Sequence, residues 1–168
     1  MHSNNSDIII AARSRLESPF LNHFKPDNLC DGGHTTLESC MEKGLGADDC
    51  YDCSGIVIAS LCEVLKINPA HWPKEYRHAK QLALLEERSS SKAGDIAVFY
   101  QEESPSLHLG ILVAKKTVIH ASGLAKSVTE GEVRGKFSRI GIIPSEKLLD
   151  LGAEAHAVGT TGSTLTRR

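Results

Sequence analysis

Hydrophobic residues recur with a helical period in the first half of the chain and form short β-branched runs in the second half. The first apolar positions lie on one helical face: Ile8, Ala11, Ala12 and Leu16. Asp7 stands where a capping residue is expected, and Pro19 ends the segment because the residue before a proline avoids helical dihedral angles. The pattern predicts a helix from residue 7 and leaves the polar residues 1–6 as a flexible N-terminus.

Two further helices are predicted in the first half. Residues 54–67 form an apolar run that is too long for an ordinary strand, which favours a buried helix that begins next to Cys53. Residues 74–87 contain a second shared helical face: Tyr76, Ala79, Leu82 and Ala83. Residues 24–49 have turn signals and cysteines but no period, which indicates an insert loop within the domain.

The second half of the chain predicts a sheet. Short β-branched runs are separated by turn signals at residues 95–100, 107–114, 117–121 and 137–143. The dipeptide at residues 115–116 separates two of these runs at hairpin spacing. Helices followed by strands, without alternation of the two, indicate an α+β fold.

The C-terminal residues add little to this core. Residues 145–151 predict a short helix, and residues 152–168, rich in glycine, threonine, alanine and serine, predict a disordered tail. The chain therefore has a single domain at residues 7–151. Its 168 residues agree with that count, since a domain takes roughly 150 residues.

Composition narrows the classes of function. Hydrophobic residues make up 40% and charged residues 24%, as in ordinary globular proteins, and a net charge of −2 gives no electrostatic case for nucleic acid. No apolar run approaches the roughly 18 residues of a membrane span, and the start lacks the regions of a secretory signal. We expect no membrane span, and either a cytoplasmic location in the producing cell or delivery by a route without a cleaved signal.

Three residues form a candidate nucleophilic site. Cys53 directly precedes the predicted buried helix, where unpaired backbone amides and the helix dipole lower the pKa of a thiol. His108 and His120 fall on two runs joined by a tight turn, so neighbouring strands bring them together. A cysteine, a base and a residue that orients the base are the parts of a cysteine acyl-transfer enzyme. Gly55 would leave room for a substrate backbone near the sulfur.

Structural interpretations of the same residues stand beside this one. A cysteine in an apolar helix is commonly a small buried hydrophobe, and a strand histidine is commonly a half-buried residue. Four cysteines could instead hold zinc: Cys30, Cys40, Cys50 and Cys53. Only one Cys-x-x-Cys pair is present, whereas zinc ribbons usually have two, and the insert cysteines could also form a disulfide outside the cytosol.

Five segments of the chain carry a family resemblance. Residues 11–20 contain a helix end followed by Ser-Pro-Phe, and residues 52–57 read Asp-Cys-Ser-Gly-Ile-Val. Residues 93–100 contain Ala-Gly-Asp-Ile, residues 108–113 read His-Leu-Gly-Ile-Leu-Val, and residues 118–121 read Val-Ile-His-Ala. In this order they resemble the motifs of the NlpC-type cysteine peptidases, a papain-like family that acts on bacterial cell walls.

The resemblance implies a papain-like α+β fold, in which N-terminal helices pack on an antiparallel sheet and the nucleophile stands at a helix start. It implies Cys53 as the nucleophile, His108 as the general base and His120 as the residue that orients the base. It also implies that the chemistry needs no metal or cofactor. We therefore expect a thiol hydrolase with a Cys-His-His triad.

The resemblance further implies a substrate. Members of the family typically hydrolyse amide bonds in peptidoglycan stem peptides, often after D-glutamate. Asp52 and Ser54 would line the substrate side and bind a peptide amine or carboxylate. Phe20 would line it too, at a position where the family often has a tyrosine, so a hydroxyl group is missing there.

Other functions of the same chemistry remain open at this point. An acyltransferase or amidase of this fold would act on a substrate outside the cell wall. The expected partners are a peptidoglycan peptide or a released muropeptide, with an inhibitor or immunity protein in addition if the chain is a secreted effector. An effector secretion system or a phage particle would be the non-classical route to the wall.

Overall fold

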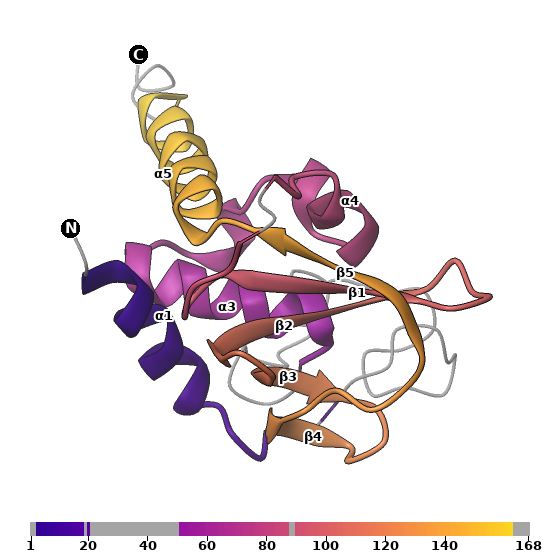
Figure 1. Cartoon of the computed structure of the whole chain (residues 1–168). Helices are drawn as coiled ribbons and strands as arrows, with labels where there is room; N and C mark the ends of the chain where they lie inside the picture. The colour runs from indigo at the N-terminus through magenta and orange to yellow at the C-terminus, as the bar shows by residue number, and fades with distance from the viewer. Residues whose placement is uncertain (1–2, 19, 21–50, 88–89, 163–168) are drawn as a thin grey trace.

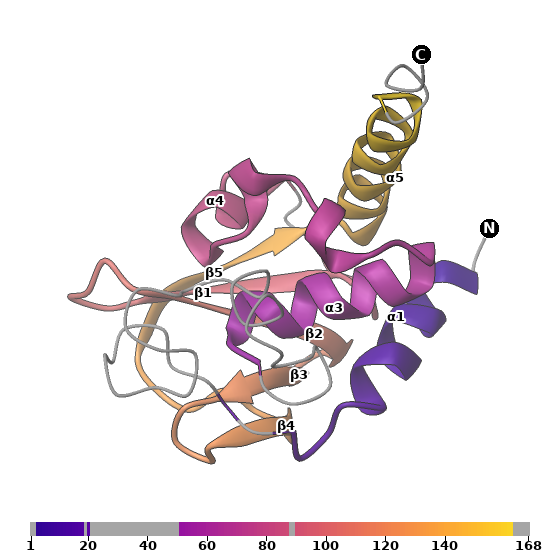
Figure 2. The same cartoon turned by 180° about the vertical axis from the view of Figure 1, so that it is seen from behind.

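The computed structural model describes residues 3–18, 20, 51–87 and 90–162, and it has helices packed on an antiparallel sheet (Figure 1). The five described strands lie in the order β4-β3-β2-β1-β5. Seen from behind, α1 (Ser3–Arg13) and α3 (Cys53–Leu65) lie across one face of this sheet (Figure 2). The predicted α+β class, with helices on an antiparallel sheet, is confirmed.

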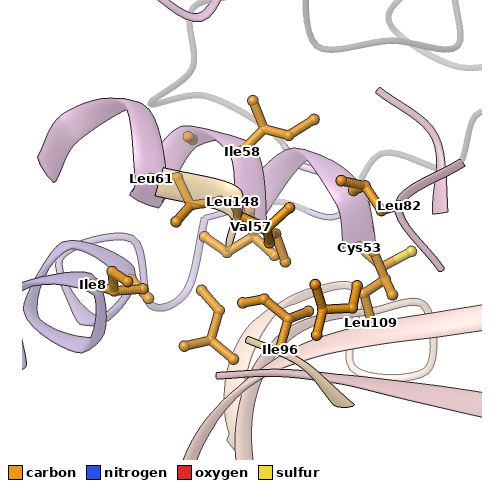
Figure 3. Close-up of a cluster of buried hydrophobic side chains, with 14 of the residues drawn as sticks. Ile8, Cys53, Val57, Ile58, Leu61, Leu82, Ile96, Leu109 and Leu148 are labelled. Atoms are coloured by element: carbon orange, nitrogen blue, oxygen red, sulfur yellow. The ribbon is translucent and has the colours of Figure 1, made fainter. Parts of the chain in front are cut away.

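Helix α3 is the centre of the hydrophobic core, because every one of its first ten residues is buried. Its side chains pack between α1, the sheet and the start of the last helix (Figure 3). Ile8 of α1 and Ile96 of the sheet are both fully buried in this cluster. Complete burial explains why α3 has apolar residues all around rather than on a single face.

Helix α1 begins earlier than its apolar pattern predicts. It starts at Ser3, so Asp7 lies inside the helix and is not its cap, and residues 3–6 are helical rather than part of a flexible end. The side-chain amide of Asn5 donates to the carbonyl of Ala93 at 2.9 Å, and Asn5 also accepts from Ser145. These contacts with distant segments hold the polar first turn in place, and a one-dimensional pattern cannot show them.

The predicted helix at residues 74–87 is broken into short pieces. The chain forms 3-10 turns η1 (Pro69–His71) and η2 (Lys74–Tyr76) and then the short helix α4 (Ala79–Ala83). The side-chain oxygen of Gln81 accepts from the backbone amides of Arg77 and His78, which starts a new helix at that point. The predicted apolar residues still face the core, with Leu82 fully buried.

The sheet contains the four predicted strands and one more. They are β1 (Ile96–Gln101), β2 (Leu107–Ala114), β3 (Thr117–Ser122) and β5 (Phe137–Ile143), all paired antiparallel with their neighbours. The additional strand β4 (Ser127–Gly131) pairs with β3 and was not predicted. The turn at residues 115–116 joins β2 to β3, as the hairpin spacing predicts.

The strands divide their side chains between two faces. In β1, Ile96 and Val98 join the core under the helices, whereas Ala97 and Phe99 join a second apolar cluster. Phe99 lies opposite His108 in the register of β1 and β2. Because directly opposite residues share a face, His108 belongs to the side of the second cluster.

The last helix is longer than predicted. Helix α5 runs from Ser145 to Gly162, so residues 152–162, which composition predicts as a disordered tail, are helical. Both views show α5 projecting away from the sheet (Figures 1 and 2). None of the helices in the described part of the chain is long and apolar enough to cross a membrane.

A fully buried carboxylate joins the start of α5 to the sheet. Asp95 accepts hydrogen bonds from the backbone amides of Lys92 and Ser145 at 3.1 and 3.0 Å, and from the Ser145 hydroxyl at 3.3 Å. A buried donor left without an acceptor costs more free energy than its hydrogen bond contributes to stability. The carboxylate of Asp95 therefore holds the two segments together.

We predict that Asp95→Ala destabilises the protein by about 3 kcal/mol, because it leaves three donors without this acceptor. Urea unfolding followed by circular dichroism measures the change. Asp150→Ala, at an exposed position of α5, is the matched control and should stay within about 0.5 kcal/mol of wild type. Equal unfolding midpoints for the two variants would contradict the proposed role of Asp95.

Candidate active site

Cys53 is the first residue of α3, and the residue before it fixes that position. Asp52 is the N-cap, and its Oδ1 accepts from the Gly55 amide at 2.5 Å and from the Ser54 hydroxyl at 3.0 Å. A Cβ on Gly55 would lie 2.9 Å from the same oxygen, so a side chain there would crowd the cap. Gly55 therefore admits the capping carboxylate, a role that differs from the substrate clearance expected from sequence.

The thiol of Cys53 is buried, with 8% of the residue exposed. Burial raises its pKa to about 12, and the nearby negative charge of Asp52 acts in the same direction. Backbone amides of Leu109, Ser54 and Cys53 itself lower the pKa, as a helix start should, but burial outweighs them. The expectation of a lowered thiol pKa is wrong for this state of the protein, because position at a helix terminus says nothing about burial.

The two histidines are in direct contact. Nε2 of His108, at the start of β2, lies 2.8 Å from Nδ1 of His120 in β3, with the rings nearly perpendicular at 87°. The contact leaves Nδ1 of His108 as the ring nitrogen that does not face His120. The juxtaposition is the one predicted from the hairpin.

Burial keeps both rings neutral near pH 7. It lowers the pKa of His108 to about 4, with a smaller contribution from the charge of His120, and it also lowers the pKa of His120. With the thiol pKa raised, the free protein has a neutral thiol and a neutral His108 ring in the walls of one cavity rather than a thiolate–imidazolium pair.

The histidine pair extends to a third strand. Oγ1 of Thr129 in β4 lies 3.4 Å from Nε2 of His120, and the two residues are directly opposite in the register of β3 and β4. Sequence reasoning missed Thr129 because it did not predict β4. The β-branched pair Val128-Thr129 is the local signal that could have indicated this strand.

Two cavities meet at His108. One, of about 740 Å³, is lined by Cys53, Asp52 and Phe20 together with residues of α4 and the loop before β2. The other, of about 550 Å³, is lined by both histidines, Thr129 and the segment between β4 and β5. His108 and Gly123 line both cavities, so the histidine pair stands between two spaces that a bound chain could occupy.

The three predicted substrate-side residues have different surroundings. Phe20 lines the larger cavity, and its backbone amide donates to the carbonyl of Lys126 beside β4. Asp52 also lines it, but one oxygen of its carboxylate already caps α3. Ser54 is buried and its hydroxyl donates to Asp52. The hydroxyl of Ser54 thus supports the cap.

The four cysteines considered for a zinc site lie mostly outside the described residues. Cys30, Cys40 and Cys50 lie outside the described residues. Within the described residues, no group of three or more histidine, cysteine, aspartate and glutamate side chains could hold a metal ion. Cys53 and Cys62 are free thiols.

Comparison with known families identifies the fold. The family model described as the NlpC/P60 family matches residues 36–141, and the chain belongs to this family. The motifs at residues 52–57, 93–100, 108–113 and 118–121 all lie within the match. The predicted resemblance to NlpC-type cysteine peptidases is confirmed. No curated protein matches the chain.

Solved structures share the fold at low sequence identity. NlpC1 from Trichomonas vaginalis is 20% identical with a TM-score of 0.55, over 86% of this chain and 44% of that one. The peptidoglycan hydrolase RipB from Mycobacterium tuberculosis is 17% identical with a TM-score of 0.54, over 86% of this chain and 65% of RipB. The chain thus spans less than half of NlpC1 and about two thirds of RipB.

The same fold also occurs without catalysis. RipD from Mycobacterium tuberculosis, described as a non-catalytic NlpC/p60 domain protein adapted to peptidoglycan binding, is 14% identical with a TM-score of 0.52. The alignment covers 85% of this chain and 98% of RipD. Catalysis in this fold therefore depends on the residues of the site and not on the fold alone.

We predict that iodoacetamide alkylates Cys53 slowly at pH 7 and faster as the pH rises toward 10, because the neutral thiol is a poor nucleophile. Trypsin leaves Cys53 and Cys62 in one peptide, residues 44–66, so fragmentation of this peptide by tandem mass spectrometry locates the label and measures the rate at each thiol and pH. Cys62, whose pKa burial also raises to about 12, is the matched internal control. A rate for Cys53 that is already at its plateau near pH 6 would instead indicate a preformed thiolate–imidazolium pair.

We predict that His108 makes the fold less stable in acid. Its pKa of about 4 lies below the value of 6.5 for an unperturbed histidine, so the unfolded chain takes up the proton first as the pH falls. Stability from this group is therefore present above pH 6.5 and is lost between pH 6.5 and 4. The loss is on the order of 3 kcal/mol.

Chemical unfolding of wild type and His108→Gln at pH 7 and pH 4 measures this contribution. The variant should lose less stability than wild type over that interval. His71→Gln, in η1 and away from the site, is the control for removing one histidine. Equal pH dependence for wild type and His108→Gln would show that His108 is not held neutral by the fold.

Proposed function

We propose that the chain is a cysteine hydrolase that cleaves an amide bond in a peptidoglycan stem peptide, with Cys53, His108 and His120 as the triad. The observation that carries the proposal is the 2.8 Å contact between the two histidines, at the wall of the cavity that also contains Cys53. Two imidazoles in contact beside a cysteine at a helix start match the nucleophile, base and orienting residue of cysteine acyl-transfer chemistry.

The first step moves the thiol proton to His108. Because Nε2 of His108 faces His120, Nδ1 is the nitrogen assigned to accept the proton from Cys53. The sulfur then attacks the amide carbonyl, and the tetrahedral oxyanion forms near the start of α3. The backbone amide of Cys53, at this helix terminus, is a suitable donor to that oxyanion.

The second part of the reaction restores the enzyme. His108 gives its proton to the leaving amine, the carbon–nitrogen bond breaks, and a thioester on Cys53 remains. Water, deprotonated by His108, attacks the thioester and releases the carboxylic acid and the thiol. His120 keeps the ring of His108 in position throughout and takes no proton itself.

The resting state sets a condition on this sequence of steps. Transfer of a proton from a thiol whose pKa is raised to about 12 to a ring whose pKa is lowered to about 4 is unfavourable in the free protein, so the proposed reaction requires that bound substrate brings the two pKa values closer together. The charge pair forms only as the substrate reacts, in a buried site where the two opposite charges stabilise each other strongly.

The choice of substrate rests on the family and on its relatives. This chain belongs to the NlpC/P60 family, and solved structures with the same fold include the peptidoglycan hydrolase RipB. Cavities of about 740 and 550 Å³ on the two sides of His108 give space for a short peptide on both sides of the cleaved bond. A bond after D-glutamate is our proposed cleavage point, in intact wall or in released muropeptides.

Digestion of purified peptidoglycan, with mass analysis of the products, tests the proposal. Wild type should release peptide fragments with a new amine and a new carboxylic acid, each cleavage adding one water. Cys53→Ala and His108→Ala should both abolish release, because they remove the nucleophile and the base. His120→Asn should retain measurable activity, because an amide can still orient the ring.

Two results would overturn the proposal. Release by Cys53→Ala at the wild-type rate would show that another group performs the reaction. Binding of wild type to peptidoglycan without any release, as described for RipD, would show a non-catalytic domain.

A further inference from the structure

The hydrogen bond between Thr129 and His120 has no part in the reaction steps proposed for this site. Oγ1 of Thr129 lies 3.4 Å from Nε2 of His120, on the side of the ring opposite to His108. The three side chains come from three successive strands, β2, β3 and β4, and all line the same cavity of about 550 Å³. His120 itself is only 6% exposed, so its ring nitrogens depend mainly on protein partners.

The chemistry of two imidazoles in contact restricts where the hydrogens can lie. When His108 carries the proton from Cys53, both of its ring nitrogens bear a hydrogen. His120 must then present a lone pair at Nδ1, because two N–H groups cannot face each other at 2.8 Å. The hydrogen of a neutral His120 is therefore on Nε2, which faces Thr129.

We propose that Thr129 is a positioning residue, whose hydroxyl oxygen accepts the Nε2 hydrogen of His120 and thereby stabilises His108 in its protonated state. The proposal rests on the proposed function, since the protonated state of His108 occurs only during the reaction at pH 7. It extends the triad by one group that does not touch the substrate or the reacting atoms.

The register of the sheet supports this role. Thr129 is directly opposite His120 in the pairing of β3 and β4, so the backbone of both strands fixes the distance between the two side chains. A threonine hydroxyl can accept this hydrogen, and its β-branched side chain has few rotamers. The hydrogen stays on Nε2 of His120 in the resting state too, because Nδ1 of His108 must carry the lone pair that accepts the thiol proton and Nε2 of His108 therefore donates to His120.

The contribution should be moderate rather than essential. A neutral hydrogen bond adds little net free energy, and the cavity beside Thr129 can admit water that partly replaces the hydroxyl. Other charged or titratable groups around the two cavities are Asp52, Cys53, His78, Lys80, Glu132 and Arg134. All of these stay unchanged when only Thr129 is replaced.

Two variants separate the hydroxyl from the shape of the side chain. Thr129→Val keeps the branched shape without the hydroxyl, and Thr129→Ser keeps the hydroxyl. With peptidoglycan as substrate, Thr129→Val should lower kcat on the order of tenfold with KM nearly unchanged. Thr129→Ser should stay within about threefold of wild type.

A second measurement does not depend on activity. Nitrogen-15 NMR of the histidine rings identifies which nitrogen carries the hydrogen and follows the titration of His108. Wild type and Thr129→Ser should show His120 with its hydrogen on Nε2. In Thr129→Val, His108 should titrate at a lower pH than in wild type, because its protonated state has lost support.

The outcomes distinguish the two proposals. If the protein cleaves peptidoglycan but Thr129→Val matches wild type in kcat and in the titration of His108, the role of Thr129 is wrong. A hydrogen on Nδ1 of His120 in wild type would also overturn it. If no variant cleaves peptidoglycan but the NMR results are as expected, the role of Thr129 stands and the proposed function fails.

Discussion

The packing of the start of α3 against β2 is the constraint on which the rest of the site depends. The cap made by Asp52 and the amide of Gly55 decides that the helix starts at Cys53 and not a residue earlier or later. Leu109, in the core under α3, holds β2 against the helix at this point, and Figure 3 shows Leu109 near Cys53. His108, one residue before Leu109, is thereby brought to the wall of the cavity that contains the sulfur.

Because side chains alternate between the two faces of β2, Leu109 and His108 lie on opposite sides of the sheet. Leu109 points into the core beneath α3, whereas His108 shares the other face with Phe99. His108 therefore lies next to Phe99 of the second apolar cluster and lines both cavities, and His120 lines the smaller one. The sheet fixes His108, and the helix fixes Cys53, so the relative position of the two side chains depends on the whole core between them.

Burial and the helix terminus act on the thiol in opposite directions. Amides at the start of α3 favour a thiolate, but a residue in the core loses its hydration, and the carboxylate of the cap is a like charge close by. The same Asp52 that positions Cys53 therefore also helps to keep the thiol neutral. In the free protein the thiol is therefore protonated near pH 7, and a protonated thiol is a poor nucleophile.

The sequence by itself determined the family, the α+β class, the four predicted strands and the hairpin that brings His108 to His120, because periodicity, turn residues and spacing are local properties. It also pointed to Cys53, since this cysteine directly precedes the long apolar run at residues 54–67. Tertiary structure decided the rest. The hydrogen bond from Ser145 to Asn5, across 140 positions of the chain, helps to hold the first turn of α1, which composition leaves flexible. Burial reverses the thiol pKa expected for a helix start, and β4 supplies Thr129 through pairing with β3. The first two depend on residues that are distant in sequence and adjacent only after folding, and for that reason no local pattern could show them. Strand β4 pairs with a neighbour close in sequence, and its local signal is limited to the β-branched pair Val128-Thr129.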